Sequence, residues 1–147
     1  MSLDDSIHHE ITKLCEQGDS LVKSGDFRGA LRLFHRSWKL LPEPKEDWDA
    51  STWILSAIGD AHFFLGDFQN VIAALSNAVH CPNGLGSPFV HLRLGEAAYE
   101  LGQMDRAKDE LTRAYMGAGK EIFASEDPKY LAYLETILQP MPGHEKL

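Results

Sequence analysis

Histidine and cysteine are the side chains of this sequence that could bind a transition metal. The chain has seven histidines and two cysteines. His8 and His9 are adjacent, so on a helix their side chains point in different directions. None of the histidines lies in the H-E-x-x-H spacing that places two imidazoles on one helix face. We therefore predict no metal site, although histidines brought together from different segments remain an alternative.

Covalent and phosphate chemistry has no better support in the sequence. There is no G-x-S-x-G, no Cys-His signature and no phosphate-binding loop. Cys15 and Cys81 lie far apart, which disfavours a disulfide framework or a zinc site and predicts buried or half-buried free thiols. The glycines of "NGLGSP" follow no predicted strand, so they indicate a linker. The sequence predicts a protein that is not an enzyme and has no cofactor.

The overall charge limits the class of partner. The chain has 147 residues, enough for one compact domain, and its 22 acidic and 14 basic side chains give a formal charge of −8. This excess argues against nucleic acid or an anionic membrane as partner and is compatible with a basic protein. The start, "MSLDDSIHHE", has no signal-peptide pattern, and no stretch approaches about 20 apolar residues. We expect a soluble, cytoplasmic protein.

Three segments of the chain share one pattern, and this repetition organises the rest of the interpretation. Each segment carries two glycines seven residues apart, which fix the alignment twice. The corresponding pairs are Gly18 with Gly25, Gly59 with Gly66, and Gly95 with Gly102.

Apolar residues recur at helical spacing on both sides of the second glycine of each pair. This glycine is expected to end the first helix, where a positive φ is favoured. Asp26, Asp67 and Asp105 lie near the start of the following helix, where a carboxylate can cap free N–H groups and meet the positive end of the helix dipole. No stretch has convincing strand alternation. The sequence predicts an all-α fold of three helix-turn-helix segments.

This pattern resembles the tetratricopeptide repeat. The first segment has counterparts of the family's small glycine, post-turn aromatic, alanine, phenylalanine, small residue and closing proline, which are Gly18, Phe27, Ala30, Phe34, Ser37 and Pro42. Most departures in the later segments are conservative in size, except His62, where the family usually has tyrosine. The repeats are spaced more widely than in the family, and the excess lies in "PEPKEDWD" and "CPNGLGSP".

The resemblance implies a right-handed α-solenoid within a single domain of residues 1–147. Its repeats would span about residues 11–43, 50–83 and 87–119. In the segment that follows, Asp127 and Pro128 predict the N-cap and first residue of a further helix. The apolar stripe of this helix is expected to cover the last repeat, as a cap over residues 120–139. Residues 140–147 are expected to form a mobile tail.

In the tetratricopeptide repeat family the first helices line a concave groove, which implies a partner-binding surface here. Acidic residues directly follow the aligned glycines and would form an acidic ladder, with aromatic side chains around it. Such a surface suits a basic polypeptide, because aromatic anchors exclude water and carboxylates pair with cations. The predicted partner-binding residues are Asp19, Trp53, Asp60, Phe63, Phe64, Phe89, Leu92, Glu96, Tyr99 and Glu100.

The doubled phenylalanine in "SAIGDAHFFLGDF" is assigned to this groove. Neighbouring side chains on a helix point about 100° apart, so one narrow apolar stripe does not hold both Phe63 and Phe64. Leu55, Ile58 and His62 are expected on the side packed against neighbouring helices. The alternative is that some of the groove aromatics pack between repeats or under the C-terminal helix.

The resemblance also bears on function. A variant of the family holds a C-terminal carboxylate with Lys, Asn and Arg, but the matching positions here include Cys15, Asp19, Ala57 and Phe89, and only Arg93 agrees. We therefore exclude a carboxylate clamp. The chain is similar to small bacterial tetratricopeptide proteins encoded beside secreted toxins, which implies an immunity protein that neutralises a cognate toxin. The alternative is an adaptor or chaperone for assembly of a secretion or envelope complex.

Overall fold

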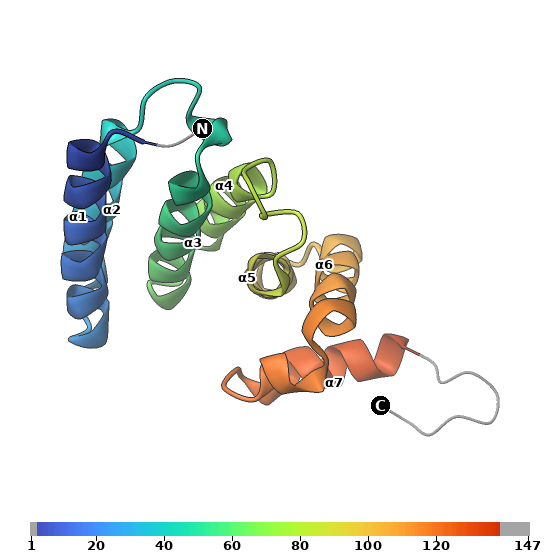
Figure 1. The fold of residues 1–147 in the computed structure, drawn as a ribbon. Coiled ribbons are helices and arrows are strands. Elements are labelled where there is room, and N and C mark those ends of the chain that lie inside the picture. Colours follow the sequence, from blue (N-terminus) through green and yellow to red (C-terminus); the bar gives the residue numbers. More distant parts are fainter. Residues whose placement is uncertain (1–2, 139–147) are drawn as a thin grey trace. The chain divides into compact units, whose positions relative to one another are not determined.

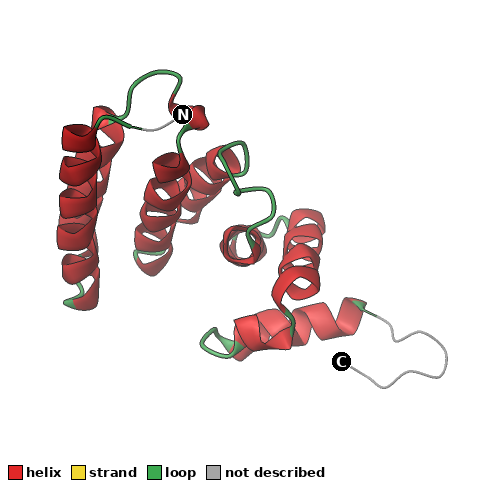
Figure 2. Ribbon diagram, viewed as in Figure 1, coloured by secondary structure: helices red, strands yellow, loops and turns green. Residues whose placement is uncertain are grey.

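The computed structural model describes residues 3–138, which contain helices and loops but no strand (Figures 1 and 2). The prediction of an all-α fold is confirmed over this range. The predicted tail, 140–147, lies outside it. The helices form two compact units, Met1–Gly86 and Ser87–Leu147, whose boundary falls in the predicted linker "CPNGLGSP". Within the described residues no helix is long and apolar enough to cross a bilayer.

The first unit consists of two helical hairpins. Helix α1 (Asp5–Lys23) packs against α2 (Phe27–Leu40), and α3 (Asp49–Phe64) packs against α4 (Phe68–Ala78). The short 3₁₀ helix η1 (Lys45–Asp47) connects the hairpins. Helix α1 begins before the predicted start of the first repeat at about residue 11, because Asp4 caps it by accepting from the backbone N–H of Ser6.

The second unit contains one hairpin and the C-terminal cap. Helix α5 (Pro88–Glu100) packs against α6 (Met104–Ala118), followed by the 3₁₀ helix η2 (Lys120–Phe123) and α7 (Pro128–Ile137). Asp127 is the N-cap of α7 and Pro128 its first residue, as predicted. Helix α7 packs against α6 and buries Tyr130 and Leu134.

The turn inside each hairpin has the same backbone geometry. Gly25, Gly66 and Gly102 have φ of 87°, 75° and 75°, a region that residues with a Cβ seldom adopt. After α1, the N–H of Gly25 donates to the carbonyl of Val22 at 3.0 Å and the N–H of Asp26 to that of Leu21 at 2.8 Å. This pair of bonds is the Schellman motif, and it recurs after α3 and α5. The predicted C-cap role of these glycines is confirmed.

The three predicted aspartate caps differ from one another. Asp26 accepts from the backbone N–H of Gly29 at 2.9 Å and caps α2 as expected. Asp67 precedes α4 but makes no capping bond to the backbone, since its carboxylate accepts from the side chain of Asn70 at 2.6 Å. Asp105 lies inside the first turn of α6, whose N-cap is Gln103. Only the first of the three is a side-chain N-cap.

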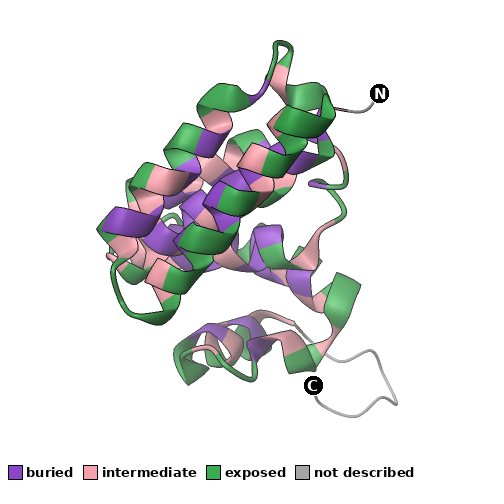
Figure 3. Cartoon of the chain, turned by 60° about the vertical axis from the view of Figure 1, so that its left-hand side comes forward, coloured by how far each residue is buried: buried purple, intermediate pink, exposed green. Residues whose placement is uncertain are grey.

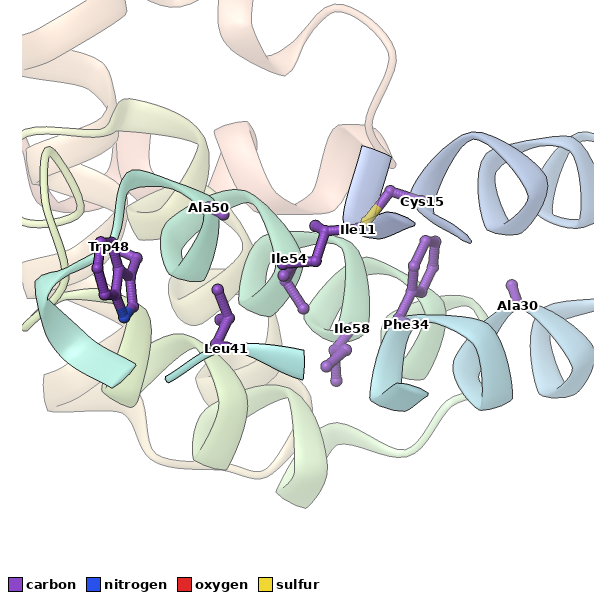
Figure 4. Close-up of a cluster of buried hydrophobic side chains, with 9 residues drawn as sticks. All are labelled: Ile11, Cys15, Ala30, Phe34, Leu41, Trp48, Ala50, Ile54 and Ile58. Carbon is purple, nitrogen blue, oxygen red and sulfur yellow. The ribbon is translucent and has the colours of Figure 1, made fainter. Parts of the chain in front are cut away.

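A continuous apolar core joins the helices of the first unit. Phe34 of α2 and Ile11 of α1 are almost completely buried, and Ile54 and Ile58 extend the cluster along α3 (Figure 4). Buried positions recur at helical spacing between exposed ones, as Figure 3 shows. Cys15 and Cys81 are buried free thiols, in agreement with the sequence-based expectation.

Glycine at the first aligned position lets the two helices of each hairpin approach closely. A Cβ added to Gly18 would lie 2.4 Å from the ring of Phe34, and one added to Gly59 would lie 2.6 Å from Leu75. The equivalent distance from Gly95 to Leu111 is also 2.6 Å. These separations are far below van der Waals contact, so a larger residue would force the buried partner to move.

We predict that Gly18→Ala lowers the free energy of unfolding by about 1–2 kcal/mol, because overpacking against Phe34 outweighs the gain in helix propensity. Gly86→Ala is the matched control, since a Cβ there meets no atom within 4 Å. Urea denaturation followed by circular dichroism measures both. Equal midpoints for the two variants would show that the close approach does not constrain the fold.

Candidate functional site

The predicted partner-binding residues of the first unit lie on α1 and α3. Trp53 and Phe64 on α3 are 40% and 50% exposed, unusual values for such large apolar side chains. Asp19 on α1 is exposed, and Asp60 and Phe63 are half-buried. We call these five residues the α1–α3 face.

Desolvation raises the pKa of Asp19, although Lys23, one turn further along α1, opposes the shift. The nearby Glu16 acts in the same direction as desolvation. Such a carboxylate gains more from a cationic partner than a fully hydrated one, because part of its solvation is already lost.

Aromatic rings continue from this face into the packing between the hairpins. Phe64 stacks on Phe27 of α2, with ring centroids 5.3 Å apart and planes at 21°. Phe63 meets Phe64 edge-on at 5.9 Å and Phe68 of α4 at 5.7 Å. The doubled phenylalanine therefore joins α3 to both neighbouring helices, and Phe64 still presents half of its surface.

The predicted residues of the second unit lie on α5, and they differ in accessibility. Phe89, in the first turn, is 70% exposed. Leu92 and Glu96 are buried. The expectation that Glu96 offers a carboxylate to a partner, as Asp19 and Asp60 were expected to do, is therefore wrong, because this side chain is fully buried.

Glu96 belongs to a buried ionic cluster instead. Nη1 of Arg93, one turn earlier on α5, donates to Oε1 of Glu96 at 2.8 Å and also to Oε1 of Glu126, from the loop before α7. One guanidinium cannot neutralise two carboxylates. Burial, reinforced by the neighbouring Glu126, raises the pKa of Glu96 to about 9, so near neutral pH this side chain carries a proton.

Helix α7 covers the remaining two predicted residues. Glu100 accepts from Nζ of Lys129 at 2.8 Å and from the hydroxyl of Tyr130 at 3.0 Å. The ring of Tyr99 meets the rings of Tyr130 and Tyr133 edge-on, at 5.5 and 5.4 Å. The alternative that aromatics pack under the C-terminal helix therefore holds for Tyr99.

The described residues contain no cluster of three His, Cys, Asp or Glu that could hold a metal ion. A buried polar pair that was not predicted is His91 with Glu110, whose Nδ1 and Oε1 atoms lie 3.0 Å apart between α5 and α6. The bond from Arg93 to Glu126 was not predicted either. Neither pair has a local sequence signal, because the partners lie on different elements.

We predict that Glu96→Gln stabilises the protein increasingly as pH rises. The folded-state pKa lies above the ordinary value of 4.5, so the contribution of this proton to stability is full below pH 4.5 and is lost as pH rises through about 9. Glutamine cannot ionise, so it avoids this loss. The melting temperature of the variant should exceed that of the wild type by about 5 °C near pH 9, and by less near pH 5.

Thermal melts at several pH values and constant ionic strength make this comparison. Glu135→Gln makes the same substitution at an exposed position of α7, where the carboxylate is solvated, and should follow the wild-type curve. Parallel curves for the wild type and Glu96→Gln would contradict a protonated Glu96.

Comparisons with known proteins agree with these helical hairpins. No family model matches the chain, and no curated protein matches it by sequence. The structure of the Yersinia enterocolitica type III secretion chaperone SycD in complex with a peptide of the translocator YopD matches with a TM-score of 0.69 and 18% identity, over 92% of this chain and 94% of that one.

Two further structures match in the same way. The first tetratricopeptide domain of Spaghetti (RPAP3), bound to the HSP90 peptide SRMEEVD, has a TM-score of 0.69 and 17% identity, over 88% of this chain and 90% of that one. PcrH in complex with the chaperone binding region of PopB has a TM-score of 0.63 and 16% identity, over 90% and 93%. The fold of this chain is that of tetratricopeptide-repeat domains.

Proposed function

We propose that this protein is a non-catalytic interaction module that binds a segment of a partner polypeptide on the α1–α3 face. The observation that carries this proposal is the exposure of Trp53 and Phe64 on α3, the helix that also carries Asp60, together with the exposed carboxylate of Asp19 on α1. Large aromatic side chains are the residues that most often dominate binding energy when a partner covers them.

The chemistry of the partner follows from the charge of this face. Two of its five residues are acidic, and the chain as a whole has a formal charge of −8. A basic segment with apolar side chains would pair with the carboxylates and cover the rings. The electrostatic field of these negative charges would also increase the rate of encounter with a cationic partner. Phe89, exposed on α5 of the second unit, is proposed as a separate contact.

An adaptor or chaperone role has the support of the structural comparisons. SycD and PcrH are chaperones or chaperone-like proteins solved with segments of the proteins they bind, and the RPAP3 domain was solved with a short peptide. We propose that this chain likewise holds a segment of a client protein. The second candidate, an immunity protein, is favoured by the acidic charge, which suits a basic toxin domain. A toxin gene beside this one would favour immunity, and an apparatus operon would favour the adaptor.

We predict that Asp19→Lys and Trp53→Ala each reduce partner capture by about tenfold or more, because each removes an anchor of the proposed face. Cross-linking of the tagged chain in host lysate, followed by quantitative mass spectrometry, measures capture. Asp109→Lys is the matched control: it makes the same charge change at an exposed position on α6 and should retain the partner. Equal capture by all three variants would place the binding surface elsewhere.

We also predict that affinity for the captured partner falls as salt increases, since exposed charges are screened over about 10 Å at 0.1 M salt. Titration calorimetry with the identified segment at low and high ionic strength tests this. The decrease in affinity with increasing salt concentration should be smaller for Asp19→Lys than for Asp109→Lys. An affinity that does not change with salt would remove the electrostatic part of the proposal and leave the aromatic part standing.

A further inference from the structure

The first unit has a cavity of about 260 Å³ that the α1–α3 face does not include. Its walls come from α2, α3 and α4, and none of the predicted partner-binding residues lines it. Trp38, Leu55 and Ile58 are among its apolar residues. The cavity is slightly smaller than the roughly 300–1,000 Å³ of sites for drug-sized ligands, so it suits a single ring or one side chain.

Imidazole and carboxamide groups complete the lining. Two imidazoles and two carboxamides, from His35, His62, Asn70 and Asn77, stand among the apolar residues, and no carboxylate, ammonium or guanidinium group lines the cavity. The carboxylate of Asp67 contacts His62 and Asn70 but does not line the cavity. A charged ligand would therefore lose hydration without an opposite charge in the lining. His35, Asn70 and Asn77 are exposed, and the Asn70 side chain already donates to Asp67. His62 is half-buried, so a pure hydrocarbon over it would leave its second ring nitrogen without a hydrogen bond. The lining favours a neutral ligand that is apolar over most of its surface and has one polar group.

The position of His62 indicates which polar group fits. Its Nδ1 is sealed from solvent, makes no hydrogen bond and lies 3.5 Å from Oδ2 of Asp67, a position in which the carboxylate favours the tautomer with its proton on Nδ1. This tautomer leaves Nε2 as an acceptor for a hydroxyl donor. Burial lowers the pKa of His62 despite the nearby Asp67, which keeps the imidazole neutral and able to accept near neutral pH.

We propose that this cavity binds a phenol ring, with the ring against Trp38 and the apolar residues and the hydroxyl donating to His62. An indole wall suits an aromatic ring because offset or edge-to-face contacts between rings are favourable. The phenol could come from a tyrosine side chain of a polypeptide or from a free small phenol. Both sources share the chemistry that the cavity recognises.

Nuclear magnetic resonance titration of the full chain tests the proposal with four probes. 4-Methylphenol and N-acetyl-tyrosinamide carry the hydroxyl, and toluene and N-acetyl-phenylalaninamide are their matched controls without it. We expect saturable shifts of the Trp38 indole and the Asn70 and Asn77 side-chain amides. Each phenol should bind about tenfold more tightly than its matched control, the upper end of the net effect of one hydrogen bond.

The two phenols distinguish the source of the ligand. Binding of both with similar affinity supports a tyrosine side chain, and binding of 4-methylphenol alone supports a free small phenol. Absence of saturable shifts with either phenol, shifts confined to residues away from the cavity, or equal affinity for the matched controls would overturn the proposal.

Three variants locate the site. Ala73→Phe adds a ring at an exposed position of the lining and should weaken phenol binding about tenfold or more, and His62→Phe removes the acceptor and should abolish the preference for the hydroxyl. The control variant, Ala132→Phe, makes the same alanine-to-phenylalanine substitution at an exposed position on α7 and should bind phenol as the wild type does. Ala73→Phe also serves if His62→Phe does not fold. Wild-type affinity in Ala73→Phe would overturn the assignment.

Discussion

The close contact between paired helices is the constraint on which the rest of this structure depends. Gly18, Gly59 and Gly95 each place one helix backbone directly against a large side chain of the next helix, a phenylalanine or a leucine. This approach sets which side of the first helix is buried. The acidic residue that follows each glycine is then turned by about 100° from the contact. These three contacts therefore determine which residues of α1, α3 and α5 can face a partner.

The same repeat position has three different environments in this chain. Asp19 is exposed, Asp60 is half-buried, and Glu96 is fully buried with its proton retained. Repeats with the same backbone pattern therefore differ in which of their equivalent side chains reach the surface. In the second unit the loop before α7 brings Glu126 to Arg93, and a carboxyl group that could have faced a partner becomes part of the internal packing.

Local patterns were sufficient to predict the helices, their glycine C-caps and the N-cap of α7. Those features depend on backbone preferences within a few residues, as at Gly25 and Asp127. The burial of Glu96 and the stacking of Phe64 on Phe27 were not predictable in this way, because each depends on a residue from a different helix or loop. The helical spacing of apolar residues distinguishes the faces of a helix, but it does not identify which residues cover each face. The cavity beside His62 escaped prediction for the same reason, since three helices line it.

The division into two compact units coincides with a division of the aromatic residues. All three tryptophans, Trp38, Trp48 and Trp53, lie before Gly86, and all four tyrosines, Tyr99, Tyr115, Tyr130 and Tyr133, lie after it. Tryptophan emission under selective excitation consequently comes from the first unit. Comparison of this emission with the helical circular dichroism of the whole chain would reveal whether the first unit loses its structure before the rest, without any label.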